Sequence, residues 1–95
     1  MESNHKTKEL FELIARTTDP EDIAALFSDL CTIKETENMA ERLFAAKLLM
    51  EGNTYNQVMA KTGISSATLS RVSRCLQRGS GGYSEILRGT LEDKD

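Results

Sequence analysis

The chain of 95 residues lacks tryptophan and has a single histidine, His5. A catalytic triad or a zinc centre built on histidine needs that residue beside a nucleophile or beside further ligands, and no such residues are spaced around His5. The chain also has no glycine-rich phosphate loop and no nucleophile elbow. We therefore expect no enzyme activity, no metal site and no bound cofactor.

Cysteine is also scarce, and long apolar runs are missing. Cys31 and Cys75 form no ligand cluster and accompany no secretory signal, so we expect both to be reduced, buried thiols. No apolar segment approaches the roughly 20 residues of a membrane span. The first residues, M-E-S-N-H-K, lack the features of a signal peptide. These absences predict a cytoplasmic protein with no membrane partner.

Charge is distributed unevenly along the chain. The net charge of -3 argues against a protein that coats nucleic acid indiscriminately. Between residues 47 and 88, however, six basic side chains accompany only two acidic ones. The acidic excess lies before and after this stretch, so a locally basic region is left in the second half of the chain.

Apolar residues recur at helical spacing, and the alternating pattern typical of strands is absent. Three helices are expected in the first half, over residues 5–17, 19–31 and 32–51. Asp19 followed by Pro20 is a strong helix start, and Thr32 with Glu35 forms a capping box. The predicted fold class is therefore all-α.

The segment of residues 54–78 predicts two short helices joined by a glycine turn, the outline of a helix-turn-helix. Gly63 can adopt the left-handed backbone that ends a helix. Capping residues mark both helix starts: Thr54 with Gln57 for the first, and Ser65 or Ser66 for the second. This motif makes DNA binding the leading hypothesis.

The side chains of this motif divide into an apolar stripe and a basic stripe. Val58 of the first helix is expected to contact Leu69 and Val72 of the second, with Ile64 filling the corner between them. Beside the apolar stripe, arginines recur at spacings of three and four residues: Arg71, Arg74 and Arg78. A basic stripe on the helix expected to enter the major groove favours a contact with DNA over a merely solvated surface.

The last part of the chain carries weaker signals. Residues 79–82, G-S-G-G, break the helix, and residues 83–88 are expected to form a short helix capped by Ser84, followed by a polar tail from Leu91. We therefore predict a single domain over residues 1–95. It comprises a helical dimerisation core at 5–53, the helix-turn-helix at 54–78, and the glycine break, short helix and tail at 79–95.

The chain resembles the Trp repressor superfamily, and more closely its YerC/YecD branch. The resemblance extends from about Leu10 to Tyr83. It is carried by D-L-C-T-I-K-E at 29–35, A-K-L-L-M-E-G at 46–52, T-Y at 54–55, T-G-I-S-S-A-T-L-S-R-V-S-R-C-L at 62–76 and G-G-Y at 81–83. It implies an intertwined helical homodimer that presents two helix-turn-helix reading heads to double-stranded DNA. The apolar surface of residues 10–50, too large for a lone small domain to cover, agrees with a dimer.

The resemblance also implies which residues contact DNA. The base-facing positions match Ser66, Ala67 and Ser70. The complete predicted set is Thr54, Gln57, Lys61, Ser65, Ser66, Ala67, Thr68, Ser70, Arg71 and Arg74. Because short side chains cannot make bidentate contacts with bases, we expect specificity to depend on water and DNA shape, with Arg71 as the candidate for direct reading.

An effector pocket is a separate question. In tryptophan-binding relatives the indole lies between an arginine of the long helix and an arginine of the reading helix, beside a glycine. Arg71 matches the second arginine, but Val72 replaces the glycine and Glu41, next to Arg42, replaces the first arginine. The sequence therefore predicts no response to tryptophan. A different small-molecule effector would use a pocket formed by Arg42, Arg71 and Val72.

Two functions from different classes follow from these observations. The first is a sequence-specific transcriptional regulator, a repressor, that binds a palindromic operator as a dimer. The alternative is a helical dimeric adaptor for protein interactions, with a helix-turn-helix retained only for packing. The salt dependence of DNA affinity distinguishes the two.

Overall fold

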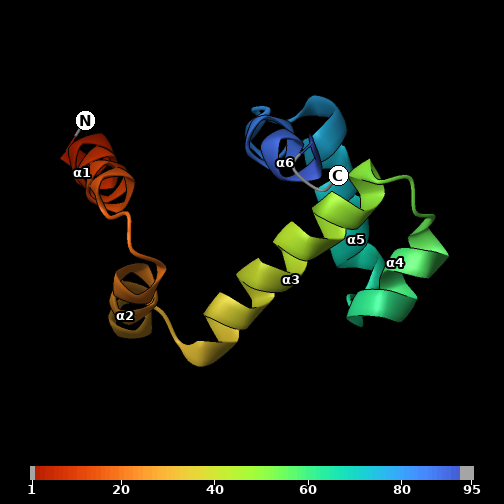
Figure 1. The fold of residues 1–95 in the computed structure, drawn as a ribbon, viewed down its shortest axis with the longest axis horizontal. Helices are drawn as coiled ribbons and strands as arrows, with labels where there is room; N and C mark the ends of the chain where they lie inside the picture. The colour runs from red at the N-terminus through yellow and green to blue at the C-terminus, as the bar shows by residue number, and fades with distance from the viewer. Residues whose placement is uncertain (1, 93–95) are drawn as a thin grey trace. The chain divides into compact units, whose positions relative to one another are not determined.

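The computed structural model describes residues 2–92 of the chain and contains only helices, turns and loops over that range. The helices are α1 (Glu2–Arg16), α2 (Pro20–Leu30), α3 (Ile33–Met50), α4 (Tyr55–Thr62), α5 (Ser66–Arg78) and α6 (Gly82–Glu92) (Figure 1). The all-α prediction is confirmed. None of these helices is long and apolar enough to cross a membrane.

The chain forms two compact units, residues 1–36 and residues 37–95, with the boundary inside α3. The prediction of one domain with a separate dimerisation core is not tested by this division and stays a prediction. The helix-turn-helix, formed by α4 and α5, lies wholly within the second unit.

The first unit is organised by helix caps. The Asp19 carboxylate accepts a hydrogen bond from the Glu21 backbone N–H at 3.0 Å, and Pro20 occupies the first turn of α2. Thr32 and Glu35 form a reciprocal capping box, with bonds of 2.8 and 3.0 Å, at the start of α3. Both predicted helix starts are confirmed. Between residues 5 and 36 no side chain is buried, so this unit has no core of its own.

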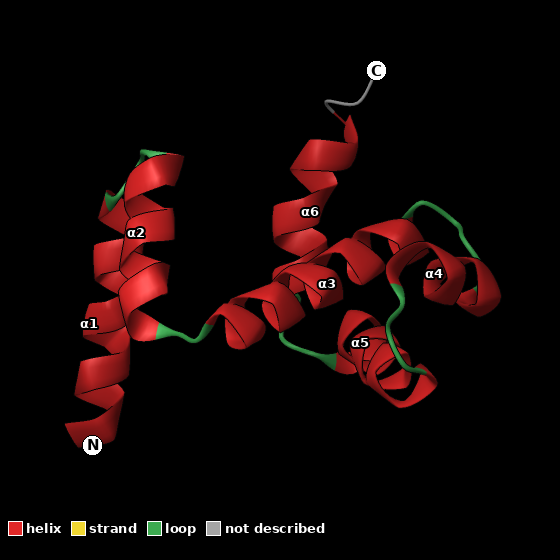
Figure 2. Cartoon of the chain, turned by 90° about the horizontal axis from the view of Figure 1, so that it is seen from below, coloured by secondary structure: helices red, strands yellow, loops and turns green. Residues whose placement is uncertain are grey.

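The second unit has a core in two parts, and α4, α5 and α6 surround the C-terminal half of α3 (Figures 1 and 2). The first cluster joins α3, α4 and α5 through Ala45, Leu48, Val58, Ile64 and Leu69. The second joins α3, α5 and α6 through Ala46, Val72 and Leu87. Since α5 contributes to both clusters, its orientation is fixed by contacts on two sides.

Three details differ from the sequence predictions. Val58 and Leu69 share a cluster as expected, but Val72 belongs to the cluster with Ala46 and Leu87, because α6 packs against that side of α5. Cys75 is exposed and Cys31 is half-buried, so the expectation of two buried thiols was wrong. Cys31 is the C-cap residue of α2, in the unit without a core, and Cys75 belongs to neither core cluster.

The last helix also differs from its prediction. It begins at Gly82 and continues to Glu92, past the predicted end at residue 88 and into the predicted tail. Ser84 therefore lies inside the helix and does not cap it. The Ser80 hydroxyl instead accepts a bond from the Gly82 backbone N–H at 3.4 Å. Residues 93–95 of the predicted tail lie outside the described residues.

Candidate nucleic-acid interface

Helix α4 is held at both ends by local hydrogen bonds. The Thr54 hydroxyl accepts a bond from the Gln57 backbone N–H at 3.2 Å, and the Gln57 side-chain oxygen accepts one from the Thr54 backbone N–H at 2.8 Å. Gly63 ends the helix with a φ of +78°, and its N–H donates to the Met59 carbonyl. The predicted capping box and glycine turn are confirmed. A residue other than glycine would be strained at position 63.

Hydrogen bonds and a buried side chain connect the turn between α4 and α5 to both helices. The Thr62 hydroxyl donates to the Val58 carbonyl at 2.8 Å and accepts from the Ile64 backbone N–H at 3.1 Å. Ile64 is 8% exposed and packs in the cluster shared by both helices. The hydrogen bonds and the buried side chain therefore fix the angle between the two helices.

Helix α5 is capped by Ser65, which is the one of the two predicted caps that the structure uses. The Ser65 hydroxyl accepts a bond from the Thr68 backbone N–H at 3.2 Å and donates to the Thr68 hydroxyl at 3.0 Å. Ser66 is the first residue of the helix and is exposed. The cap leaves the Ser66 side chain available for a ligand.

Helix α5 has one buried face and one exposed face. Leu69 and Val72 are 0% and 1% exposed, and Ser73 beside them is 8% exposed. The exposed residues of the helix are mostly small or basic, and they include Ser66, Ala67, Ser70, Arg71, Arg74 and Arg78. A rigid helix with one polar, basic face matches the requirements of a helix that lies in the major groove.

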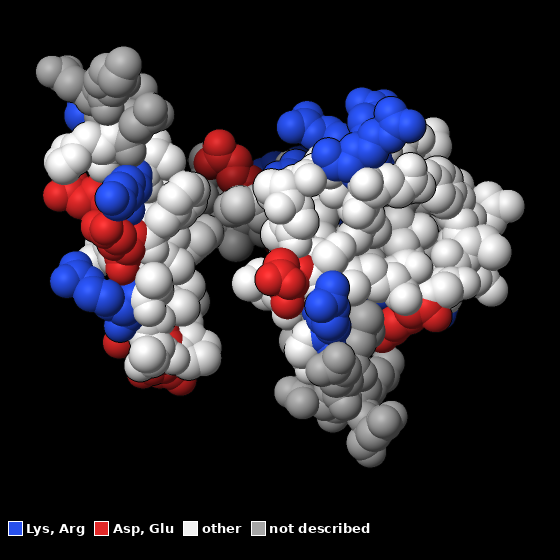
Figure 3. Space-filling view, turned by 90° about the horizontal axis from the view of Figure 1, so that it is seen from above, with Lys and Arg blue, Asp and Glu red and all other residues white. Residues whose placement is uncertain are grey.

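Basic side chains gather on the edge of the second unit that α5 forms (Figures 2 and 3). The three arginines of this helix are all exposed. Acidic side chains are also visible in this view, one group beside the basic side chains and the others further from them (Figure 3). The α5 edge is therefore a positive surface on a chain whose net charge is negative, and such a surface attracts DNA locally.

The structure brings the predicted DNA-binding residues onto the helix-turn-helix and leaves almost all of them accessible. Thr68 is half-buried, and its hydroxyl accepts a hydrogen bond from the Ser65 hydroxyl. The others are exposed: Thr54, Gln57, Lys61, Ser65, Ser66, Ala67, Ser70, Arg71 and Arg74. Their role in DNA binding stays a prediction, since exposure shows access and not contact.

One feature of this region was missed from the sequence. The Lys61 ammonium donates a hydrogen bond to the Asn53 side-chain oxygen at 3.1 Å, although the two residues are eight positions apart. Asn53 precedes the cap of α4, so the charged end of Lys61 lies near the start of that helix. Asn53 carries no local sequence signal beyond its position after Gly52.

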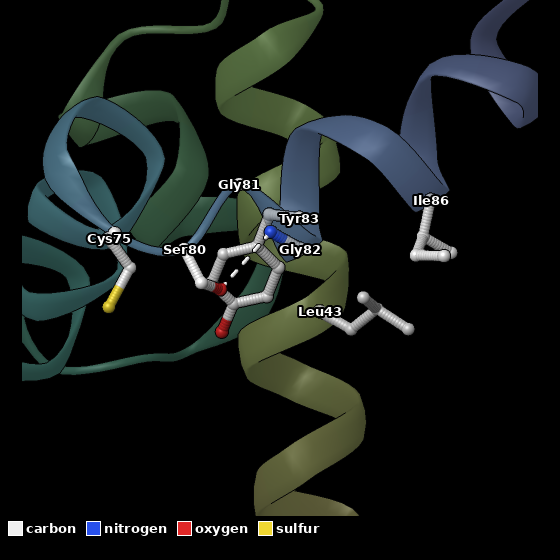
Figure 4. Close-up of a pocket in the computed structure, with 8 residues that line it drawn as sticks. Leu43, Cys75, Ser80, Gly81, Gly82, Tyr83 and Ile86 are labelled. Atoms are coloured by element: carbon white, nitrogen blue, oxygen red, sulfur yellow. Dashed lines mark hydrogen bonds between the residues drawn. The ribbon is translucent and has the colours of Figure 1, made fainter.

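The predicted effector residues differ in burial, and the pocket predicted from them stays a prediction. Val72 is buried in the core, Arg71 is exposed and Arg42 is half-buried. A cavity of about 410 Å³ instead lies beside the loop between α5 and α6 (Figure 4), where the Ser80 hydroxyl accepts from the Gly82 N–H. It is lined by Leu43, Cys75, Gly79, Ser80, Gly81, Gly82, Tyr83 and Ile86.

Comparisons with known proteins agree with this geometry. The uncharacterized protein YerC of Bacillus subtilis is 46% identical over 79 residues, which are 83% of this chain and 76% of that protein. A candidate Trp repressor from Staphylococcus aureus, solved as a crystal structure, has a TM-score of 0.87 and 37% identity, covering 92% of this chain and 87% of its own.

A second solved structure, a TrpR-like protein from Eubacterium eligens, has a TM-score of 0.86 and 36% identity, covering 90% of this chain and 89% of its own. The family model described as Trp repressor protein matches residues 5–91. The TrpR-like fold predicted from the sequence is therefore confirmed. The chain belongs to the Trp repressor family.

Proposed function

We propose that this protein is a sequence-specific, DNA-binding transcriptional repressor that binds a palindromic operator as a homodimer. The observation that carries the proposal is the exposed face of α5, where small residues and arginines lie opposite a buried apolar face. Membership of the Trp repressor family makes a helix-turn-helix regulator the expected class. Action on DNA also implies the cytoplasmic location predicted from the sequence.

The exposed residues of α5, which we call the reading face, differ in length and therefore suit different contacts with DNA. Ser66, Ala67 and Ser70 are short, so α5 can approach the floor of the major groove closely. Arg71 is long enough to reach either a base edge or a phosphate, while Arg74 lies one turn further along. We infer that direct base reading rests mainly on Arg71, with water and DNA shape supplying the remaining specificity.

Uncovered apolar side chains support the homodimer. Several large apolar residues of the first unit are exposed, and the most exposed are Phe11 at 61%, Leu30 at 55% and Ile33 at 79%. Burying one such side chain fully contributes about 1.5–3 kcal/mol, so leaving all of them in water is costly. A second copy of the chain would cover them and would place two α5 helices on one face of DNA.

The position of Val72 supports a regulator that does not respond to tryptophan. Val72 is 1% exposed and packs with Ala46 and Leu87, so a branched side chain of the core stands where the tryptophan-binding relatives have a glycine. Glu41, at the position of the relatives' first arginine, is exposed and acidic. Neither residue can sandwich an indole. Tryptophan is therefore expected to leave DNA affinity unchanged.

Selection of bound duplexes from a random pool tests this proposal. We expect enrichment of a palindromic sequence whose half-sites lie about one DNA turn apart, roughly 34 Å, because a two-fold dimer presents two equivalent α5 helices. Enrichment of a single half-site would contradict the dimer. If no sequence were enriched from the pool, that result would contradict sequence-specific DNA binding.

A protein-interaction adaptor is the alternative, and exposed apolar residues on the second unit favour it. Leu43, Phe44 and Ile86 are 45%, 49% and 71% exposed, and two of them line the cavity beside the glycine loop. In the same selection experiment this alternative predicts no enriched sequence. It also predicts that replacing Arg71 and Arg74 does not change the affinity of the adaptor for its protein partner.

A further inference from the structure

The junction between α3 and α4 is built around Asn53. The Asn53 backbone N–H donates to the Leu48 carbonyl at 3.1 Å, and the Gly52 N–H donates to the Leu49 carbonyl at 3.0 Å. With Gly52 at a φ of +100°, these bonds form a Schellman motif that ends α3. The Asn53 side-chain N–H adds a second bond to the Leu48 carbonyl at 2.9 Å. The amide group of Asn53 is therefore anchored to the core helix.

The same amide group holds Lys61. Its oxygen accepts a hydrogen bond from the Lys61 ammonium at 3.1 Å. Side chains on a helix lean toward its N-terminus, so a lysine near the end of α4 can return to the residue before the cap. The ammonium is thereby held beside Asn53, the residue before the N-cap of α4.

We propose that Asn53 is a positioning residue for DNA binding, because it orients the exposed Lys61 ammonium toward a DNA phosphate. This inference rests on the proposed function. Asn53 itself need not touch DNA: it is half-buried and engaged with the Leu48 carbonyl, whereas Lys61 is exposed.

A neutral acceptor suits this role better than a carboxylate. An ammonium has three donors, so one bond to Asn53 leaves two for a phosphate. The amide oxygen carries no formal charge and leaves the positive charge of Lys61 intact. An aspartate at position 53 would bind the ammonium more tightly, compete with the phosphate and repel it. It would also lose the donor that bonds the Leu48 carbonyl.

A double-mutant cycle on the full chain tests the proposal, with the DNA duplex obtained by selection as the probe. The variants are Asn53→Ala, Lys61→Met and the two combined. Lys61→Met keeps the length of the side chain and removes the ammonium. We expect Asn53→Ala to weaken DNA binding about three- to tenfold, the size expected when one long side chain must be ordered on binding. In the Lys61→Met background the same substitution should change affinity less than twofold.

The salt slope and the double-mutant cycle distinguish a positioning role of Asn53 from a purely structural one. Lys61→Met removes one ammonium from each protomer and should reduce the salt slope of DNA affinity by about two, whereas Asn53→Ala should leave the slope nearly unchanged, since the ammonium is still present. If Asn53 acted only by ending α3, it would weaken binding equally in both backgrounds. That additive result would overturn the inference while leaving DNA binding intact.

The aspartate substitution gives a second, independent outcome. Asn53→Asp keeps an oxygen acceptor beside Lys61, yet we expect it to weaken DNA binding more than Asn53→Ala does. Binding equal to or tighter than that of the alanine variant would overturn the inference. If the unchanged chain bound no duplex at all, the proposed function itself would fail, together with this role for Asn53.

Discussion

Replacing both arginines of the reading face, Arg71→Ala with Arg74→Ala, should weaken operator binding roughly 30-fold or more. Each arginine can donate charge-assisted hydrogen bonds to phosphate or to a base edge, and each such contact contributes about 1–3 kcal/mol. Both side chains are exposed on α5, away from the two core clusters, so the fold should not change. Fluorescence anisotropy with the selected duplex gives the affinities.

The single variants assign different roles to the two arginines. Arg71→Ala should also relax the preference for one base pair in each half-site, whereas Arg74→Ala should weaken all sequences similarly and reduce the salt slope by about two, one for each protomer. Arg88→Ala is the matched control, because it removes an exposed arginine from α6 and leaves α5 unchanged. Equal losses in the control and in the α5 variants would show that only overall charge matters, contrary to our proposal.

Replacing Leu69 by alanine should cost about 2–5 kcal/mol of the free energy of unfolding. Leu69 is fully buried, and its cluster joins α3, α4 and α5. A cavity there removes packing from both helices of the motif at once. Urea unfolding at one fixed protein concentration measures the effect, since the stability of a dimer depends on concentration.

The neighbouring substitution Ser70→Ala provides the control for stability. Ser70 is exposed on the opposite face of α5, so its removal should change the free energy of unfolding by less than about 0.5 kcal/mol. A loss below about 1 kcal/mol for Leu69→Ala would show that the cluster does not hold the motif together. In that case the geometry of the reading head would have another origin.

Much of the fold was predictable because its signals are local. The caps at Asp19, Thr32, Thr54 and Ser65 each use a side chain within three residues of the N–H that it satisfies. The turn at Gly63 depends on one glycine in the left-handed region. Such features are determined by a few neighbouring residues, so sequence alone was sufficient to place them.

Features that depend on distant contacts were not predictable in the same way. The assignment of Val72 to the cluster with Leu87 requires knowing where α6 packs, and α6 itself extends further than its weak start signal indicated. The exposure of Cys75 likewise depends on which sides of α5 the other helices cover. Helical periodicity indicates which side of a helix is apolar, but it does not indicate which other helix packs against that side.

The candidate site shows the same division. The reading-face residues could be placed because α5 exposes the side opposite Leu69 and Val72, and residues three and four apart share a face. The bond between Lys61 and Asn53 could not be placed, since it depends on the rotamer of a long side chain and on the end of α3. Base recognition by α5 is a proposal, and DNA-binding measurements test it.

The most direct test of DNA reading is the slope of the logarithm of affinity against the logarithm of salt concentration, measured with the selected duplex. A dimer that uses Lys61 and Arg74 on phosphates in each protomer makes four such contacts and should give a straight line with a slope of about −3.6, from roughly −0.9 for each phosphate neutralised. An affinity that does not change between low and moderate salt would contradict recognition of DNA by this surface.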